Sequence, residues 1–214
     1  MIKGVLFDLD GTLLNTLPDL HFIANATLKD FGYPERSMDE IRSFVGYGVK
    51  RLIIRALPDG VALTDEILDR MHENYLEYQN RLSERYEGIG EMLSTLRAHG
   101  VKLAIVSNKP DSAVTGVTEQ YFPGMLDFAT GERAELNRKP HPDLSNLAMQ
   151  TLGLTPEECI YVGDADTDIE TGKNANLVTL SCTWGFRDEA YLIECGADHL
   201  VHTPEEITKY VLEH

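Results

Sequence analysis

The chain has 214 residues, of which 43% are hydrophobic and 25% charged, and these values are ordinary for a folded globular protein. Its 35 acidic residues outnumber its 19 basic ones, and the formal net charge of −16 argues against a nucleic-acid groove and against binding to an anionic membrane surface. The length permits one large domain or one domain that carries an insertion.

The cellular setting is indicated by what the sequence lacks. The N-terminal residues show no basic segment followed by an apolar stretch, and the wholly apolar runs are only a few residues long, so we expect a cytoplasmic protein without membrane spans. Cys159, Cys182 and Cys195 are odd in number and lack CxxC spacing, so neither a disulfide framework nor a zinc site is expected. The expected partner is a small molecule, and the expected assembly is a monomer or a homodimer.

The first part of the chain predicts one strand followed only by helices. The strand covers about Lys3 to Leu9, and apolar residues then recur at helical spacing from Leu17 to Phe31. The expected helices that follow are Met38 to Val45, opened by the capping box Ser37-Met38-Asp39-Glu40, Val49 to Leu57, and a longer helix capped by Thr64 with Ile67, Met71, Tyr75, Tyr78 and Leu82 on one face.

From Tyr86 onward, helices alternate with short strands rich in β-branched residues. This alternation predicts an α/β fold with a Rossmann-like parallel sheet and helices on both faces. The expected elements are helix Ile89 to His99, strand Lys102 to Val106, helix Ser112 to Tyr121, strand Leu126 to Ala129, helix Pro142 to Leu152, strand Cys159 to Val162, helix Asp166 to Asn174, strand Leu177 to Ser181, and a final helix, strand and helix through Val201.

The spacing of the first two strands predicts an insertion. A strand, a crossover helix and a second strand need only about 30 residues, whereas roughly three times as many separate the first strand from the next. We therefore expect residues 14–85 to form an inserted α-helical cap domain, and residues 1–13 and 86–214 to form the core.

Polar residues follow the predicted strands at the edge where parallel sheets bind ligands. Asp8 and Asp10 follow the first strand, Ser107 and Asn108 follow the run LAIV, and Gly163-Asp164 with Asp166 and Asp168 follow CIYV. Lys139 lies in the loop NRKPHPD. The convergence of so many polar residues at one edge favours a functional site over ordinary loop chemistry.

Carboxylates that converge in this way need a cation. Two unit charges about 4 Å apart interact by about 4 kcal/mol at an effective dielectric of about 20, so the group Asp8, Asp10, Asp164 and Asp168 is strongly destabilising by itself. An all-oxygen ligand set without His or Cys favours Mg²⁺, which commonly also binds a phosphate oxygen. Ser107 and Asn108 can donate to such a phosphate, and Lys139 adds a positive charge.

FDLDGT, the Ser107-Asn108 pair, the Lys139-Pro140 loop and GDADTD, in this order, resemble the four motifs of the haloacid dehalogenase superfamily, along essentially the whole chain. The helical insertion resembles the small cap of its first subclass. Within that subclass, the segments GYGVKRL at 46–52 and TWGFR at 183–187 are similar to those of the phosphoglycolate phosphatases and their close relatives.

The resemblance implies a role for each matching residue. Asp8 is implied as the nucleophile, Asp10 as the acid and base, and Lys139 as a catalytic cation, with Ser107 and Asn108 as phosphate ligands. Asp8, Asp10 through its carbonyl, and Asp164 are implied as Mg²⁺ ligands, supported by Asp168. Gly11 and Thr12 are implied at the substrate, where backbone amides approach the phosphate.

Two further residues bear on the chemistry. A dehalogenase has no leaving alkoxide to protonate and lacks the second aspartate, so the presence of Asp10 excludes that branch of the superfamily. Ala165 departs from the Ser or Thr that relatives commonly carry after the fourth-motif aspartate, and this removes a hydroxyl but no expected metal ligand.

The cap offers candidates for selecting the substrate. We expect the turn from Gly46 to Gly48 to meet the core, with Gly46 and Arg51 or Lys50 in contact with the substrate; an ordinary turn between helices is the alternative.

The resulting hypothesis is a Mg²⁺-dependent phosphatase that forms an aspartyl-phosphate and hydrolyses a small soluble phosphate monoester, with 2-phosphoglycolate as the first candidate. Hydrolysis of pyrophosphate or of sugar phosphates and a β-phosphoglucomutase-type transfer are alternatives within the enzyme class. A receiver-like signalling module, phosphorylated on an aspartate, is the alternative outside it.

Overall fold

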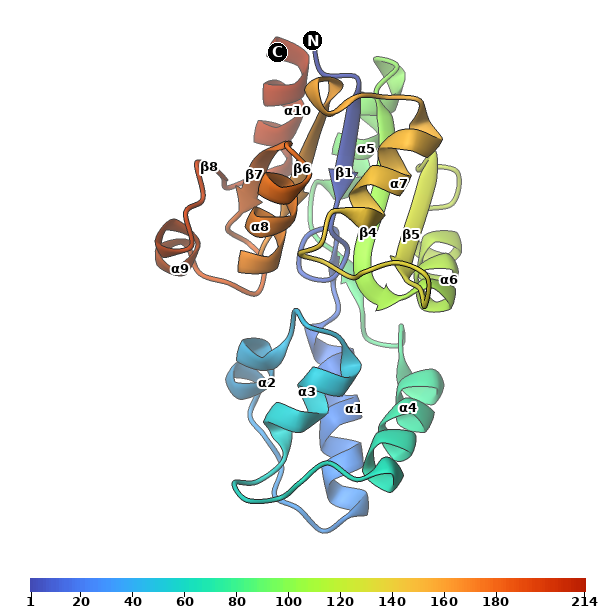
Figure 1. Cartoon of the computed structure of the whole chain (residues 1–214), viewed down its shortest axis with the longest axis vertical. Coiled ribbons are helices and arrows are strands. Elements are labelled where there is room, and N and C mark those ends of the chain that lie inside the picture. The colour runs from blue at the N-terminus through green and yellow to red at the C-terminus, as the bar shows by residue number, and fades with distance from the viewer. The chain divides into compact units, whose positions relative to one another are not determined.

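The structure is a computed structural model that describes residues 1–214, and the chain divides into two compact units. The sheet unit combines Met1–Leu14 with Arg85–His214, and the helical unit consists of Asn15–Glu84. Figure 1 labels the elements of both units. No helix of the chain combines the length and the apolar character needed to cross a lipid bilayer.

The sheet unit contains six parallel strands in the order β5-β4-β1-β6-β7-β8. This arrangement confirms the predicted Rossmann-like α/β fold. The strands are β1 Gly4–Phe7, β4 Lys102–Pro110, β5 Phe128–Glu132, β6 Cys159–Gly163, β7 Val178–Cys182 and β8 His199–Val201.

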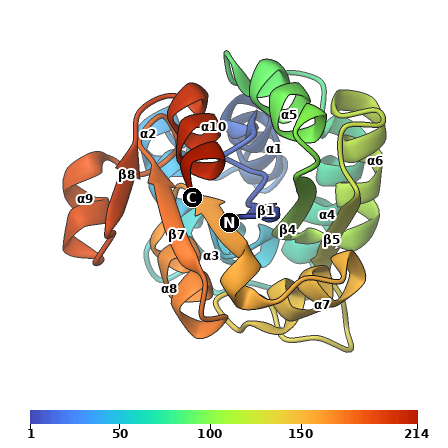
Figure 2. The same cartoon turned by 90° about the horizontal axis from the view of Figure 1, so that it is seen from above.

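Helices cover both faces of the sheet, because side chains alternate between the faces along each buried strand. In β1, Val5 and Phe7 pack into one core cluster together with α5, α6 and α10, while Leu6 packs into another cluster with α7. Figure 2 shows the two helical layers from above, with α8 beside α7. The helices are α5 Ile89–Ala98, α6 Asp111–Tyr121, α7 Asp143–Leu152, α8 Asp166–Asn174, α9 Glu189–Glu194 and α10 Pro204–Glu213, with a 3₁₀ turn at Pro156–Glu158.

The order of the strands determines where a ligand can bind. From β1 the chain continues to β4 and β5 on one side, and it then crosses back to form β6, β7 and β8 on the other. The direction of winding therefore reverses at β1, and in open α/β sheets ligands bind at the carboxyl ends of the strands around such a reversal. Phe7 pairs with Ile105 of β4 and with Val162 of β6, so the residues that follow these three lie at one level.

Two strands differ from the sequence prediction. β4 continues to Pro110 instead of ending at Val106, and β5 covers Phe128–Glu132 instead of 126–129. The reason is an irregular pairing of β4 with β5, whose register shifts between Val106 and Pro110. Ser107 and Asn108 therefore belong to the end of a strand and not to a loop.

The helical unit contains the four predicted helices, α1 Leu17–Asp30, α2 Met38–Phe44, α3 Val49–Ala56 and α4 Asp65–Tyr78. The predicted capping box is present, since the Glu40 N–H donates to Ser37 Oγ and the Ser37 N–H donates to Glu40 Oε2. Leu82 was wrongly assigned to the apolar face of the last helix. It lies beyond the end of α4 and is 54% exposed, because Asp19 of α1 accepts the N–H groups of Arg81 and Leu82 and holds this segment in a non-helical conformation.

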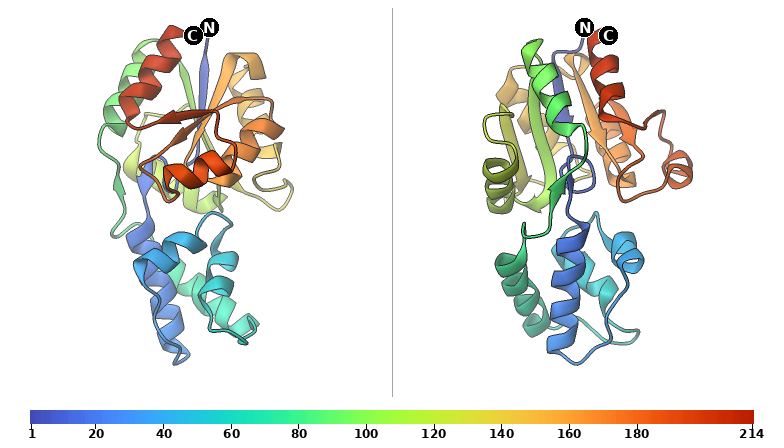
Figure 3. Two further views of the ribbon diagram at one scale, coloured as in Figure 1. Left: turned by 90° about the vertical axis from the view of Figure 1, so that its left-hand side faces the viewer. Right: turned by 180° about the vertical axis from the view of Figure 1, so that it is seen from behind.

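Two strands of two residues were not expected from the sequence. β2 Leu14–Asn15 and β3 Glu84–Arg85 pair with each other where the chain leaves the sheet unit and where it returns. Figure 3 shows the two termini of the chain close together at one end of the sheet unit.

Candidate active site

Asp8 lies at the carboxyl end of the central strand, directly after the buried run Val5-Leu6-Phe7. Its backbone N–H donates to the carbonyl of Val162 in β6 at 2.8 Å, so the sheet pairing continues to the acidic residue itself. Asp8 as a whole residue is only 8% exposed. The sheet therefore places a carboxylate in a fixed position at the reversal point.

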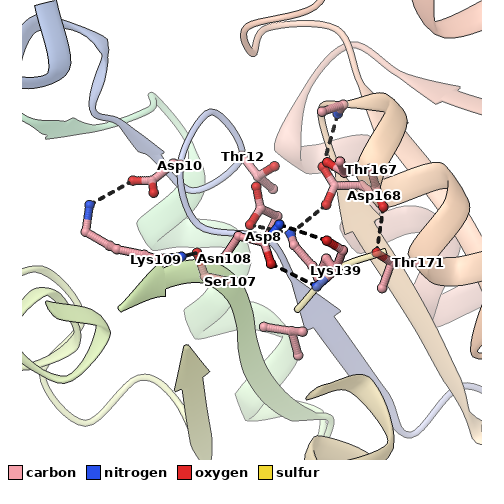
Figure 4. Close-up of polar contacts among 12 residues, drawn as sticks. Asp8, Asp10, Thr12, Ser107, Asn108, Lys109, Lys139, Thr167, Asp168 and Thr171 are labelled. Atoms are coloured by element: carbon pink, nitrogen blue, oxygen red, sulfur yellow. Dashed lines mark hydrogen bonds and ion pairs between the residues drawn. The ribbon is translucent and has the colours of Figure 1, made fainter. Parts of the chain in front are cut away.

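The ammonium group of Lys139 is the centre of the site. Its Nζ lies 2.7 Å from Asp8 Oδ1, 2.7 Å from Asp168 Oδ1 and 3.0 Å from the hydroxyl of Tyr161 (Figure 4). An ammonium carries three protons, so these three acceptors account for all of them. The side chain is 2% exposed, which means that protein groups replace nearly all of its hydration.

The backbone of Lys139 is held as firmly as its side chain. The amide of Asn108 accepts the Lys139 N–H at 2.8 Å and donates to the Lys139 carbonyl at 3.1 Å. Asn108 was predicted to bind the substrate, and the structure directs its side chain to the backbone of Lys139. The end of β4 therefore positions the lysine that lies 31 residues later in the chain.

Asp164 and Asp168 complete a buried acidic group with Asp8. One carboxylate oxygen of each residue lies within 4.8 Å of the others. Asp164 accepts from Thr12 Oγ1 at 3.0 Å and from the Phe186 N–H at 2.7 Å. Asp168 Oδ2 accepts the N–H groups of Asp164 and Ala165. Ala165 precedes α8 and has no hydroxyl with which to cap the helix, so the Asp168 carboxylate, in the first turn of α8, provides the capping contact at this end.

The acidic group is electrostatically unfavourable by itself. Burial raises the pKa of Asp8 well above its ordinary value; Lys139 opposes this shift, and the charges of Asp168 and Asp164 add to it. Burial and the neighbouring Asp168 also raise the pKa of Asp164 to about 7. Burial would lower the pKa of Lys139, but the attraction of Asp168 and Asp8 raises it well above its ordinary value.

The residues present fit a bound divalent cation. Three carboxylates and one ammonium leave a formal charge of −2 on groups that are all buried. The donors are oxygens, without His or Cys, and this is the ligand chemistry that Mg²⁺ prefers. Burial raises the pKa values of Asp8 and Asp164 in spite of Lys139, and a bound cation would oppose this shift.

Two glycines bring the backbone close to the acidic group. Gly11 has φ of +96°, a left-handed conformation that other residues rarely adopt, and a Cβ there would collide with the Asp164 carboxylate. A Cβ at Gly185 would collide with the same carboxylate. Asp164 is therefore enclosed by backbone on two sides, which fixes the direction of its oxygens.

Asp10 does not join the acidic group. Its Oδ1 lies 3.2 Å from the Nζ of Lys109, and Figure 4 shows its carboxylate directed to Lys109 and away from Asp8, Lys139 and Asp168. Ser107, also at the end of β4, is 1% exposed, and its hydroxyl accepts the Lys109 N–H at 3.2 Å. The two aspartates of the motif DLD therefore have different partners: Asp8 pairs with Lys139, and Asp10 pairs with Lys109.

The remaining candidates lie in the helical unit. Gly46 follows α2 with φ of +117°, and Arg51 lies exposed in the first turn of α3. Between them, the ring of Tyr47 lies 5.5 Å from the guanidinium carbon of Arg55. The turn from α2 to α3 is therefore built by glycines and a cation–π contact within that unit.

Several residues of the site were not predicted from the sequence. They are Tyr161, Lys109, and Phe186 through its backbone. Trp184, in the segment TWGFR singled out above, donates its indole N–H to the Thr12 carbonyl at 3.0 Å, and it was expected in a loop near the site. Tyr161 carried a usable signal, because a hydroxyl in the middle of a buried strand needs a hydrogen-bond partner. Trp184 also lines a cavity of about 670 Å³ between α5 and the start of α10.

The comparisons with known proteins cover most of the chain. Residues 5–181 match the family described as haloacid dehalogenase-like hydrolase. A phosphoglycolate phosphatase of Vibrio vulnificus is 33% identical over 222 residues, which are 99% of this chain and 96% of the relative. A phosphoglycolate phosphatase of Colwellia psychrerythraea is 34% identical over 85% of this chain and 84% of the relative.

Solved structures agree with these relatives. A candidate phosphoglycolate phosphatase from Lactobacillus delbrueckii subsp. bulgaricus superposes with a TM-score of 0.92 at 31% identity and covers 98% of both chains. A predicted phosphoglycolate phosphatase from Haemophilus somnus superposes with a TM-score of 0.89 at 28% identity, over 98% of this chain and 97% of the other. The matches in sequence and in structure lead to the same conclusion: the chain belongs to the haloacid dehalogenase-like hydrolase family and is a phosphatase.

Proposed function

We propose that this phosphatase depends on Mg²⁺ and hydrolyses a small phosphate monoester, 2-phosphoglycolate, through an aspartyl-phosphate on Asp8. The observation that carries the proposal is the geometry around Asp8. A carboxylate at the end of the central strand lies 2.7 Å from a buried ammonium and beside two further carboxylates. The choice of phosphoglycolate is supported by relatives of that name that are 30–34% identical over most of the chain.

In the first step, a carboxylate oxygen of Asp8 attacks phosphorus, and the bond between phosphorus and the leaving oxygen breaks. Protonated Asp10 gives its proton to that oxygen, so the product leaves as an alcohol. In the second step, Asp10 takes a proton from water, whose oxygen attacks the phosphorus of the aspartyl-phosphate. Inorganic phosphate departs, and both the Asp8 carboxylate and the proton on Asp10 are restored.

Asp8, the backbone carbonyl of Asp10, and Asp164 would hold Mg²⁺, which would supply the positive charge that the buried carboxylates and a bound phosphate require. Asp168 has a different task in this proposal. Its Oδ1 accepts from Lys139 and Tyr161, and its Oδ2 accepts two backbone N–H groups. We assign to Asp168 the positioning of Lys139 and of the loop that carries Asp164.

The transferring phosphoryl group would be bound by Lys139, Ser107 and the backbone at Gly11 and Thr12. Lys139 is already directed at Asp8, so it lies beside any phosphoryl group attached there. The Ser107 hydroxyl accepts from the Lys109 N–H, which leaves its proton to donate to a phosphate oxygen. Positioning and charge compensation of this kind are most of what phosphoryl transfer requires from a protein.

We further propose that the helical unit, expected at 14–85, acts as a cap that selects the substrate. β2 and β3 carry the two connections between the units and are the expected hinge. Gly46 and the cation of Arg51 are assigned to recognition of the substrate, where the carboxylate of phosphoglycolate needs a positive partner.

Replacing Asp8 with Asn is expected to remove the nucleophile and to lower kcat by about 10³-fold or more. The measurement is phosphate release, with Mg²⁺ and with chelator, from phosphoglycolate, pyrophosphate, sugar phosphates, nucleotides and an aryl phosphate. The exposed Asp59→Asn is the matched control. Full activity in the Asp8 variant would refute the nucleophile, and conversion of a hexose phosphate to its isomer without phosphate release would indicate a mutase.

Mg²⁺ is expected to stabilise the folded protein, which thermal unfolding can measure without an activity assay. At a free concentration about 100 times Kd, binding adds about 2.7 kcal/mol and raises Tm by roughly 5 to 10 °C. Asp164→Asn should lose this response, while Asp59→Asn should keep it.

The same variant tests the charge of the site without metal. Because the pKa of Asp164 is raised to about 7, its ionised form is unfavourable in the folded state. In chelator at pH 8, we therefore expect Asp164→Asn to be at least as stable as the unchanged protein. An equal Mg²⁺ shift in both proteins would contradict this metal site.

Arg51→Ala is expected to raise KM for phosphoglycolate about tenfold or more, because a charged hydrogen bond contributes about 1.5–3 kcal/mol. KM for the aryl phosphate, which has no carboxylate, should change little. Lys29→Ala, an exposed cation at the end of α1, is the control. If the ranking of substrates stays the same, Arg51 has no part in specificity.

Tyr161→Phe is expected to lower kcat by about 10- to 100-fold, because it removes one acceptor of the Lys139 ammonium and the hydroxyl that donates to the Val106 carbonyl. The ring volume is kept, so the fold should persist with a lower Tm. Tyr210→Phe on α10 is the matched control. Unchanged kcat together with a lowered Tm would show that Tyr161 serves stability alone.

A further inference from the structure

The proposed roles of the metal ligands and of Lys139 leave one buried cation without a function. Lys109 lies near the end of β4, and its side chain is 4% exposed. Its Nζ pairs with Asp10 Oδ1 at 3.2 Å, across 99 positions of the chain. The Asp10 side chain is also largely covered, at 19% exposed.

Stability alone gives a poor account of this pair. Removing an ammonium and a carboxylate from water costs free energy that their attraction seldom exceeds, and apolar side chains of similar volume often serve stability as well or better. One member of the pair, Asp10, is the residue that the proposed mechanism uses for proton transfer. A functional account therefore explains its position better than packing does.

The backbone that carries Lys109 is firmly fixed. Its N–H donates to Ser107 Oγ at 3.2 Å, and Gly131 of β5 packs so closely that a Cβ there would collide with the Lys109 carbonyl. The irregular register of β4 and β5 falls at this place, between Val106 and Pro110. The ammonium therefore extends from a rigid part of the sheet, whereas Asp10 lies in the loop that follows β1.

Two lysines divide the carboxylates of the site between them. Lys139 holds Asp8 and Asp168, and Lys109 holds Asp10 (Figure 4). The carboxylate of Asp10 is not part of the buried group formed by Asp8, Asp164 and Asp168. The ion pair with Lys109 therefore opposes rotation of the Asp10 carboxylate toward that group.

We propose that Lys109 is a positioning residue that fixes the Asp10 carboxylate on the β4 side of the site, apart from the acidic group, so that Asp10 transfers protons and does not bind metal with its side chain. This inference rests on the proposed function, in which Asp10 is the acid and base. Lys109 itself does not touch the reacting atoms. Its effect on the reaction passes entirely through Asp10.

The test is a double-mutant cycle of Lys109→Met and Asp10→Asn, with Lys109→Arg as the conservative variant. General acid and base catalysis contributes about 10²- to 10⁴-fold, and misplacing Asp10 forfeits part of it, so we expect kcat of Lys109→Met to fall about 10- to 100-fold with KM little changed. In the Asp10→Asn background the same change should have little further effect. Lys109→Arg should recover much of the loss.

A kinetic signature separates positioning from general damage. An aryl phosphate with a good leaving group needs no proton donor in the first step, whereas hydrolysis of the aspartyl-phosphate still needs a base. Lys109→Met should therefore release about one equivalent of aryl alcohol in a rapid burst, followed by slow turnover, and phosphorylated protein should accumulate. Lys102→Met, an exposed lysine on the same strand, is the matched control and should show the behaviour of the unchanged protein.

The other outcomes are equally informative. Additive effects of the two substitutions, or a KM raised about tenfold at unchanged kcat, would overturn the proposal and assign Lys109 to direct contact with the substrate. If Lys109→Met unfolds below the assay temperature, Lys109→Gln replaces it in the same cycle. If the unchanged protein hydrolyses nothing, or Asp10→Asn is fully active, the proposed function fails; if only the Lys109 variants behave normally, this inference alone fails.

Discussion

The buried ammonium of Lys139 is the interaction on which the site depends. Three carboxylates lie buried close together, and such charges are tolerated only when they are paired. Lys139 pairs with two of them, and Asn108 and Tyr161 fix its backbone and its third proton. Without this cation, folding would favour burying the carboxylates protonated, and a protonated Asp8 could not act as the nucleophile that we propose.

The topology of the sheet supplies what a single segment cannot. β1 lies between β4 and β6, so residues separated by more than 100 positions reach one level simply because three parallel strands end there. Glycine then permits the last approach: at Gly11 and Gly185 the backbone contacts the Asp164 carboxylate where a side chain would collide. The acidic group is therefore held by backbone and sheet, which are stiff, and not by long side chains.

The sequence predicted the parallel sheet and the polar residues at its edge, because periodicity and strand ends are local properties. It did not predict the partners of those residues. Asn108 was predicted at the substrate, but its contact with the backbone of Lys139 was not predicted, and neither was the pairing of Lys109 with Asp10. Both contacts depend on the course of β4, which continues beside β5 although the register of the two strands shifts between Val106 and Pro110. No local pattern of residues encodes such a shift.

The occupancy of Lys139 has a consequence for recognition of the substrate. All three of its protons are engaged by protein groups, so the Lys139 ammonium has no proton left for a second anionic group of the substrate. In the proposed mechanism, a phosphoryl group on Asp8 can exchange with the contact that Asp8 already makes, but a carboxylate elsewhere in the substrate finds no unengaged proton on Lys139. We therefore assign Lys139 to the phosphoryl chemistry alone, and we assign discrimination among phosphate esters to other cations, of which Arg51 is our candidate.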